Sequence, residues 1–399
     1  MSLRAAWSPD VDVGVVASPA FGGGKPERSS ATQPASVPDV RSGPWGNLLV
    51  TPIVIEPLES AAVALIPAEG TRWVFPQQSP VGVERILEQA GLGRPVIQKL
   101  NGRINWEPGM GATIVTPDAE TVIAIPAAVR NTLYAELARF PINTYQAKPF
   151  RFRLSQLDLW FESSRLSPET MAILRKLVYS RGDTALISDV PAACAIISSP
   201  QEQARMLKVL SRTSTLMLNL LIRPDTDVDA LTAYWGFGKR LRDVRPLLES
   251  LTRVPSGHSM DVTHLLPRFA RKRLYAYPAR DGKDLDPPYD CHWTSFNFWN
   301  DPPNDQLSNT EFVVQSIVQQ YSPVLPSELR FGDVLLLGES ENELIHSCVY
   351  IADDIVFTKN GPSHLTPWVL MELDDLLAYY QVPGRSAVRG YRANDAAER

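Results

Sequence analysis

Proline occupies 34 of the 399 positions in this chain, well above average usage. Because proline lacks a backbone N–H and fixes φ at roughly −65°, it ends helices and is excluded from central strands. The sequence therefore predicts many short elements joined by loops rather than long uninterrupted helices. At roughly 100 to 200 residues per domain, its length allows two or three domains.

Composition excludes several classes of protein. Hydrophobic residues make up 44% and charged residues 21%, which is ordinary for a globular protein and unlike a disordered or collagen-like chain. No run approaches the roughly 18 to 20 apolar residues that cross a bilayer, so no integral membrane segment is expected. No export signal is visible at the N-terminus. Three cysteines, Cys194, Cys291 and Cys348, are too few and too scattered for a disulfide framework.

Sequence patterns divide the chain into four regions. Residues 1–45 are rich in Pro, Ser, Gly and Ala, which predicts a flexible leader. Residues 46–150 are predicted to form a small α+β region, residues 151–265 a mainly helical region, and residues 266–399 a separate α+β module. Within 46–150, strand-like runs occur at 48–57, 112–117 and 121–126, and helical patterns at 81–92 and 127–140.

The predicted helical region carries a repeated helix-start signal. Ser167-Pro168-Glu169 and Ser199-Pro200-Gln201-Glu202 each place a serine at the N-cap, proline at the first helical position and an acid in the first turn. Thr226 offers a third cap before residues 227–235. These signals predict helical hairpins that serve as a spacer or scaffold.

Charge is distributed unevenly along the chain. Residues 237–273 hold nine Lys/Arg against three Asp/Glu, whereas residues 281–399 hold seven against nineteen. A basic and aromatic cluster at 268–277 has a composition that can bind nucleic acid. The net charge of −5 instead favours packing of this segment on the acidic region, or on an anionic wall polymer, so no nucleic-acid partner is expected.

The last region has the pattern of an α+β module. Helical patterns at 291–300 and 309–321 precede strand patterns at 333–340, 346–354 and 355–360, and a capping helix is predicted at 370–380. Helices followed by an antiparallel meander are typical of this fold class.

Two residues of this module have the chemistry of a nucleophile and a base. Cys291 opens a helix, where backbone N–H groups favour a thiolate, although a lone cysteine is more often a small buried hydrophobe. His346 begins an apolar strand that would hold an imidazole rigidly, although it could equally be a half-exposed histidine at a strand end. Thr358 and Asn360 share one face of the next strand, and either could orient the imidazole, whereas Lys359 points away.

Other histidines are weaker candidates. His292 follows Cys291 directly, and adjacent helical residues point about 100° apart, so it is a poor base for that thiol. The remaining histidines show no metal-ligand spacing, so no metal or other cofactor is expected.

In this order, the residues resemble the NlpC/P60 family of papain-like cysteine peptidases. That family has an Asp-Cys-Ser-Gly helix, a Gly-Asp strand, a His-x-Gly-Ile-Tyr strand and a strand that ends in a third polar residue. Cys291 matches the nucleophile, Gly332-Asp333 the strand turn, and His346 with Tyr350 the histidine strand. The resemblance covers roughly residues 275–380 and implies a papain-like helix on an antiparallel sheet.

The chain departs from the family pattern at two places. His292-Trp293 replaces Ser-Gly and brings bulk beside the nucleophile, and Thr358 aligns with the third position, where Asn360 is chemically the better orienting group. The family assigns residues flanking the cysteine to the oxyanion site and to substrate binding. The resemblance therefore implies four substrate-binding residues: Tyr289, Asp290, His292 and Trp293.

As a function, the resemblance implies a bacterial cysteine peptidase or amidase that cleaves cell-wall peptides. Its substrate would be a peptide or peptidoglycan in the periplasm or outside the cell, and the reaction requires no metal. The alternative is a binding or scaffold protein whose papain-like module has lost activity, with Thr358 and His292-Trp293 as signs of that loss.

Overall fold

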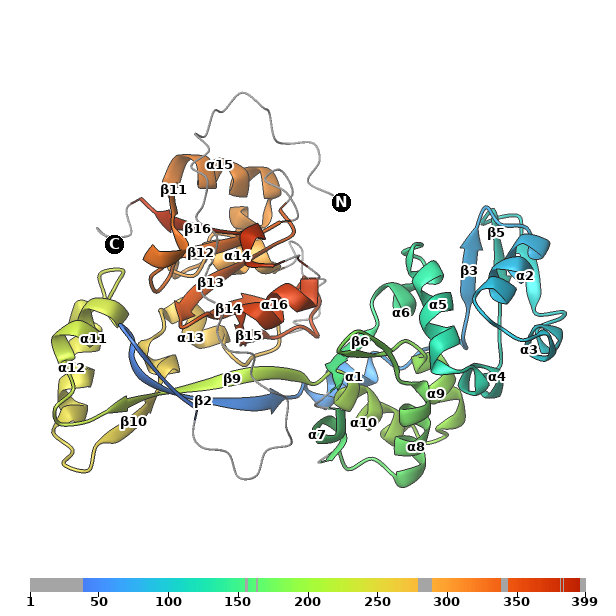
Figure 1. Cartoon of the computed structure of the whole chain (residues 1–399), viewed down its shortest axis with the longest axis horizontal. Coiled ribbons are helices and arrows are strands. Elements are labelled where there is room, and N and C mark those ends of the chain that lie inside the picture. The colour runs from blue at the N-terminus through green and yellow to red at the C-terminus, as the bar shows by residue number, and fades with distance from the viewer. Residues whose placement is uncertain are drawn as a thin grey trace. The chain divides into compact units, whose positions relative to one another are not determined.

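The computed structural model describes residues 39–154, 157–162, 164–278, 289–338, 344–380, 382 and 384–394. These residues form two compact units, each of which combines helices with antiparallel sheets, so the fold class is α+β (Figure 1). Unit 1 consists of residues up to Ile55 and from Thr213 onward, and unit 2 consists of Glu56–Arg212. In the part of the chain described, no helix is both long and apolar enough to cross a membrane.

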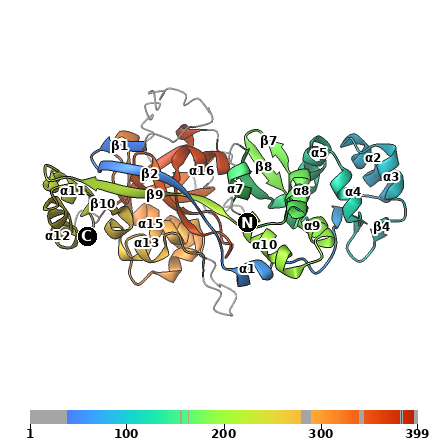
Figure 2. The same ribbon diagram turned by 90° about the horizontal axis from the view of Figure 1, so that it is seen from below.

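Unit 2 is inserted between two strands of unit 1 that pair along their length. β2 (Gly46–Ile55) and β9 (Thr213–Ile222) are antiparallel, from Asn47 opposite Leu221 to Ile55 opposite Thr213. Figure 2 shows them side by side. With β1 (Asp39–Gly43) and β10 (His258–Asp261) they form a sheet of order β1-β2-β9-β10. The boundaries expected at 150 and 265 therefore differ from this division, because the true boundary depends on pairing between distant segments.

Unit 2 surrounds its own hydrophobic core, in which Trp73, Tyr134 and Tyr179 are buried ring neighbours. Its sheets have the orders β3-β5-β4 and β6-β8-β7. Its elements are, in chain order, α1 (Glu59–Val63), β3 (Trp73–Pro76), α2 (Pro80–Gln89), α3 (Arg94–Lys99), β4 (Ile104–Glu107), β5 (Ala112–Val115), α4 (Ala119–Ala124), α5 (Ala127–Ala138), α6 (Thr144–Ala147), β6 (Phe150–Arg153), α7 (Leu157–Glu162), α8 (Pro168–Leu177), β7 (Tyr179–Arg181), β8 (Thr184–Ile187), α9 (Val190–Ile196) and α10 (Pro200–Leu210).

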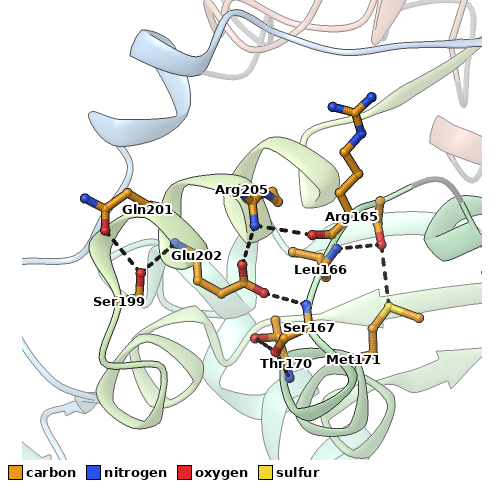
Figure 3. A network of polar contacts seen from close by, with 10 residues as sticks. Arg165, Leu166, Ser167, Thr170, Met171, Ser199, Gln201, Glu202 and Arg205 are labelled. Atoms are coloured by element: carbon orange, nitrogen blue, oxygen red, sulfur yellow. Dashed lines mark hydrogen bonds and ion pairs between the residues drawn. The ribbon is translucent and has the colours of Figure 1, made fainter.

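Both serine caps predicted in unit 2 are present. Ser167 Oγ accepts a hydrogen bond of 3.1 Å from the backbone N–H of Thr170, and Ser199 Oγ accepts one of 3.3 Å from that of Glu202. Glu202 also connects the two helices, because its Oε1 accepts a 2.7 Å bond from the backbone N–H of Ser167 (Figure 3). The N-termini of α8 and α10 are thus held together by polar contacts.

Two local predictions were wrong. Residues 121–124 belong to α4 instead of a strand, since Asp118 caps that helix by accepting from the N–H of Thr121 at 2.8 Å. The third helix cap is Asp227 instead of Thr226. Residues 151–265 contain strands, β6 to β10, besides their helices. In the first case a cap outweighed the strand preference of Val122 and Ile123.

Unit 1 holds a larger antiparallel sheet of order β11-β16-β12-β13-β14-β15. Its strands are β11 (Tyr321–Val324), β12 (Val334–Leu337), β13 (His346–Ala352), β14 (Ile355–Lys359), β15 (Trp368–Glu372) and β16 (Val388–Ala393). Its remaining elements after β9 are α11 (Val228–Trp235), α12 (Leu241–Thr252), η2 (Val262–Leu265), α13 (Arg268–Arg273), α14 (Cys291–Phe296), η3 (Asp305–Ser308), α15 (Thr310–Gln320), η4 (Pro326–Glu328), α16 (Leu373–Tyr380) and η5 (Arg385–Ala387).

Both faces of this sheet are covered, so its central strands β12, β13 and β14 are wholly buried. Alternate residues such as Val349 and Phe357 join the core that includes Trp293 and Phe296 of α14. Their neighbours, such as Tyr350 and Val356, join a second core under α16. Because successive side chains of a strand point to opposite faces, α14 and α16 lie on opposite sides of β13 and β14.

The Gly332-Asp333 turn before β12 has a structural role. Gly332 has φ +90°, and a Cβ there would collide with the indole of Trp299, so only glycine fits. Asp333 is buried and receives two hydrogen bonds from Arg392 of β16, at 2.8 and 2.7 Å. The turn therefore joins the start of β12 to its neighbour β16.

Basic residues of α13 pack within unit 1. Arg268 and Lys272 both pair with Asp301, at 2.8 and 3.5 Å. The guanidinium of Arg273 lies 4.0 Å from the ring centre of Phe269 and 5.0 Å from that of Trp293. These contacts agree with the expected packing of the basic segment on the region that follows it.

Removal of residues 56–212, with Ile55 joined to Thr213 through an Asn-Gly turn, is expected to leave a folded unit 1. Ile55 and Thr213 are already opposite each other in an antiparallel pair, and Asn-Gly suits a two-residue hairpin. Circular dichroism should show cooperative thermal unfolding. As a matched control, deletion of residues 46–150 removes β2 and should abolish cooperative unfolding. Similar behaviour of the two deletions would contradict the insertion.

Candidate active site

Cys291 is the first residue of α14, and the N-cap before it is Asp290. The Asp290 carboxylate accepts a 2.8 Å hydrogen bond from the backbone N–H of Trp293, which fixes the start of the helix. Cys291 is 7% exposed, and α14 packs on β13 and β14. The predicted helix start is thus present, and it places the sulfur beside the strand that begins at His346.

Two imidazoles act on the sulfur of Cys291. Burial alone would raise its pKa, but the charges of His292 and His346 and their hydrogen bonds to the sulfur outweigh burial and hold the pKa well below its usual range. The other two cysteines behave in the opposite way. Burial raises the pKa of Cys194 to about 11 and, together with the charge of Cys291, raises that of Cys348 well above normal. The thiolate is therefore favoured at Cys291 alone among the three.

His346 is fully buried and is fixed by a chain of polar groups on β14. Its Nε2 lies 2.8 Å from Thr358 Oγ1, and Thr358 Oγ1 donates to Asn360 Oδ1 at 3.1 Å. Asn360 Nδ2 in turn lies 3.1 Å from the sulfur of Met371. A thioether sulfur only accepts hydrogen bonds, so the amide N–H₂ faces Met371 and the amide oxygen faces Thr358.

This chain sets the tautomer of His346. Thr358 has one hydroxyl proton and gives it to Asn360, so it can only accept from His346, whose Nε2 must carry a proton. The other ring nitrogen, Nδ1, is buried and has no hydrogen-bond partner among the described residues. Since Nε2 is engaged by Thr358, Nδ1 is the nitrogen available to the sulfur of Cys291. The two candidates for third residue thus act in series.

One face of His346 is covered by Tyr380, the last residue of α16. The two rings are stacked, with centroids 4.2 Å apart and an angle of 26° between their planes. Stacking and the bond to Thr358 together restrict the imidazole to one orientation.

His292 lies closer to Cys291 than expected. Its Nδ1 is 3.0 Å from Ser347 Oγ. Burial alone would lower the pKa of His292. The charge of Cys291, a hydrogen bond to its sulfur and the charge of Asp290 outweigh burial and raise that pKa to about 9. The expectation that adjacent helical residues cannot meet was wrong here. Cys291 is the first residue of α14, and Ser347 of β13 holds the next imidazole against the sulfur.

Lys359 approaches the same site from β14. It does point away from Thr358, as expected, but that opposite face is the one covered by α14. Its Nζ is fully buried and donates to the carbonyl oxygens of Gly361 and Ser363. Burial lowers its pKa to about 8, against the opposing charges of Asp290 and Cys291.

Two of the four expected substrate-binding residues, Tyr289 and Trp293, stack on each other next to Cys291. Trp293 is fully buried, stacks on Tyr289 with centroids 4.1 Å apart, and donates from Nε1 to Asp305 at 3.3 Å. The bulk that Trp293 adds thus points into the core, because the third residue of α14 faces the sheet, and it is not placed to contact a substrate. Tyr289 is partly buried on top of it. Burial and the charge of Cys291 raise the pKa of Asp290.

Sequence reasoning missed Ser347, Tyr380 and the approach of Lys359. Ser347 had a usable signal, because it follows His346 directly and so must lie on the opposite face of β13. Tyr380 had none, since its contact depends on how α16 packs. Among the described residues, no group of three or more His, Cys, Asp or Glu side chains is placed to hold a metal ion.

Searches against protein-family models, curated proteins and solved structures find no match to this chain.

The structure predicts selective alkylation of Cys291. At pH 7, iodoacetamide should label Cys291 much faster than Cys194 or Cys348, because only Cys291 has a lowered pKa. Labelling measured by peptide mass spectrometry from pH 4 to 10 should show Cys291 reacting well below the ordinary cysteine pKa of about 8.5. The two other thiols are internal controls, and equal labelling of all three would contradict the prediction.

Proposed function

We propose that this protein is a cysteine hydrolase of papain-like, NlpC/P60-related type that cleaves an amide bond in cell-wall peptides. One observation carries the proposal: a helix-start cysteine whose pKa is lowered by His292 and His346, the latter an imidazole fixed in turn by Thr358 and Asn360. Nucleophile, base and orienting group in this order are the arrangement that activates a thiol for acyl transfer.

In the proposed reaction, Nδ1 of His346 takes the proton of Cys291, and the thiolate attacks the amide carbonyl. The carbonyl electrons move to oxygen, which needs a hydrogen-bond donor. Asp290 accepts from the backbone N–H of Trp293, so the N–H groups of Cys291 and His292 at the start of α14 are the candidate donors. Collapse of the tetrahedral intermediate expels the amine, and water then releases the acyl group from sulfur.

Cell-wall peptides are the substrate class that the motif resemblance favours. Its motifs occupy the elements that they require: Cys291 at the start of α14, Gly332-Asp333 at the turn into β12, and His346 with Tyr350 on β13. A peptidoglycan substrate would put the protein in the periplasm or outside the cell. The rival function, an inactive binding module, is an outcome of the experiment below.

The wild-type protein is expected to release peptides from purified peptidoglycan, detected by mass spectrometry. Cys291→Ala should abolish release, and His346→Gln should lower the rate on the order of 100-fold or more, as loss of a general base does. Cys348→Ala, which removes a buried thiol of unfavourable pKa, is the matched control and should stay active. If the wild-type protein binds peptidoglycan and Cys291 is labelled but no product forms, the protein is a binding module.

Thr358→Val should lower kcat about 10- to 100-fold with little change in KM, because it removes the acceptor that positions His346. Thr358→Ser keeps the hydroxyl and should restore most of the activity. Asn360→Ala should have a smaller effect, since Asn360 acts through Thr358. Unchanged kcat in Thr358→Val would contradict a role for this hydroxyl.

A further inference from the structure

Two imidazoles flank one thiol in this site, which is one more than thiol activation requires. The charges of His292 and His346 both lower the pKa of the Cys291 thiol, so both rings lie near enough to act on its sulfur. Each is held by a hydroxyl on a different element, His346 by Thr358 of β14 and His292 by Ser347 of β13. The imidazole of His292 is therefore positioned by a hydroxyl in the same way as that of His346.

The two rings differ in their access to solvent. His346 is fully buried, stacked on Tyr380 and bonded through Nε2, so among the described residues Nδ1 is its nitrogen without a hydrogen-bond partner. His292 is partly exposed. Since its Nδ1 is engaged by Ser347, Nε2 is the nitrogen that can serve the reacting atoms. Of the two rings, His292 is therefore the one exposed to solvent, whereas His346 is enclosed by protein.

We propose that the two histidines divide the proton transfers: His346 activates the thiol, and His292, positioned by Ser347, protonates the leaving amine and later deprotonates water. This assignment rests on the proposed hydrolase function. It makes His292 a catalytic residue, since its ring would exchange protons with the leaving amine and with water.

The protons balance over one turnover. The cycle starts with the Cys291 thiolate, whose proton His346 has taken, and with protonated His292. Sulfur bonds to the carbonyl carbon, and the C–N bond breaks as His292 gives its proton to the amine. Neutral His292 then takes a proton from water as the hydroxide oxygen bonds to the acyl carbon. The C–S bond breaks, and the thiolate is restored beside protonated His346.

A substrate whose leaving group needs no proton tests thiol activation without testing protonation of the leaving group by His292. The probes are p-nitrophenyl acetate, whose p-nitrophenolate needs no proton, and peptidoglycan, whose amine does. His292→Gln should retain the initial burst of p-nitrophenolate, lose steady-state ester turnover, and digest peptidoglycan on the order of 100-fold more slowly. His346→Gln should lose the burst itself. Ser347→Ala should resemble His292→Gln with a smaller loss.

His258→Gln replaces an exposed histidine of unit 1 and is the matched control. If His292→Gln digests peptidoglycan like His258→Gln, the inference is overturned while the hydrolase proposal stands. His292→Gln could also lower three measurements by the same factor: the ester burst, amide cleavage and iodoacetamide labelling of Cys291. In that case the role of His292 is structural and the inference is again overturned. If the wild-type protein has no hydrolytic activity on either probe, the proposed function itself fails.

Discussion

Stabilisation of a negative charge on a buried sulfur is the constraint on which the rest of the site depends. Desolvation by itself would keep Cys291 protonated, as it does Cys194 and Cys348. Two imidazoles reverse that tendency, but a charged or hydrogen-bonding ring can do so only if it is held near the sulfur. The hydroxyls of Thr358 and Ser347 hold the imidazoles of His346 and His292. These polar groups lie on two adjacent strands whose other neighbours are mostly apolar core residues.

The alternation of side chains along β13 provides both supports from two successive residues. His346 points to the face that α16 covers, where it meets Thr358 and Tyr380, and Ser347 points to the face that α14 covers, where it meets His292. Both faces of β13 thus carry polar residues of the candidate site, and every residue of His346–Ala352 is buried. The helices α14 and α16 that cover the two faces enclose these contacts.

The local parts of this arrangement could be predicted from the sequence, and the parts that depend on distant pairing could not. The helix start at Cys291, the strand at His346 and the serine caps at Ser167 and Ser199 are set by nearby residues, so their patterns were sufficient. The choice between Thr358 and Asn360 stayed open because it depends on hydrogen-bond direction, which only the position of Met371 resolves. The division at Ile55 and Thr213 was missed because the pairing of β2 with β9 spans the whole of unit 2.

The strand β9, which with β2 flanks the inserted unit 2, also supports the strands that position the hydroxyl of Thr358. Thr215 of β9 exchanges two hydrogen bonds of 3.0 Å with the backbone N–H and C=O of Leu370 in β15, through a single side-chain oxygen. Thr358 of β14 is paired with Val369, the residue before Leu370. The backbone that sets the position of Thr358 is therefore joined to β9 within one residue of its own partner. Because β9 also pairs with β2, the strands on either side of the insertion belong to the same compact unit as the backbone that carries Thr358.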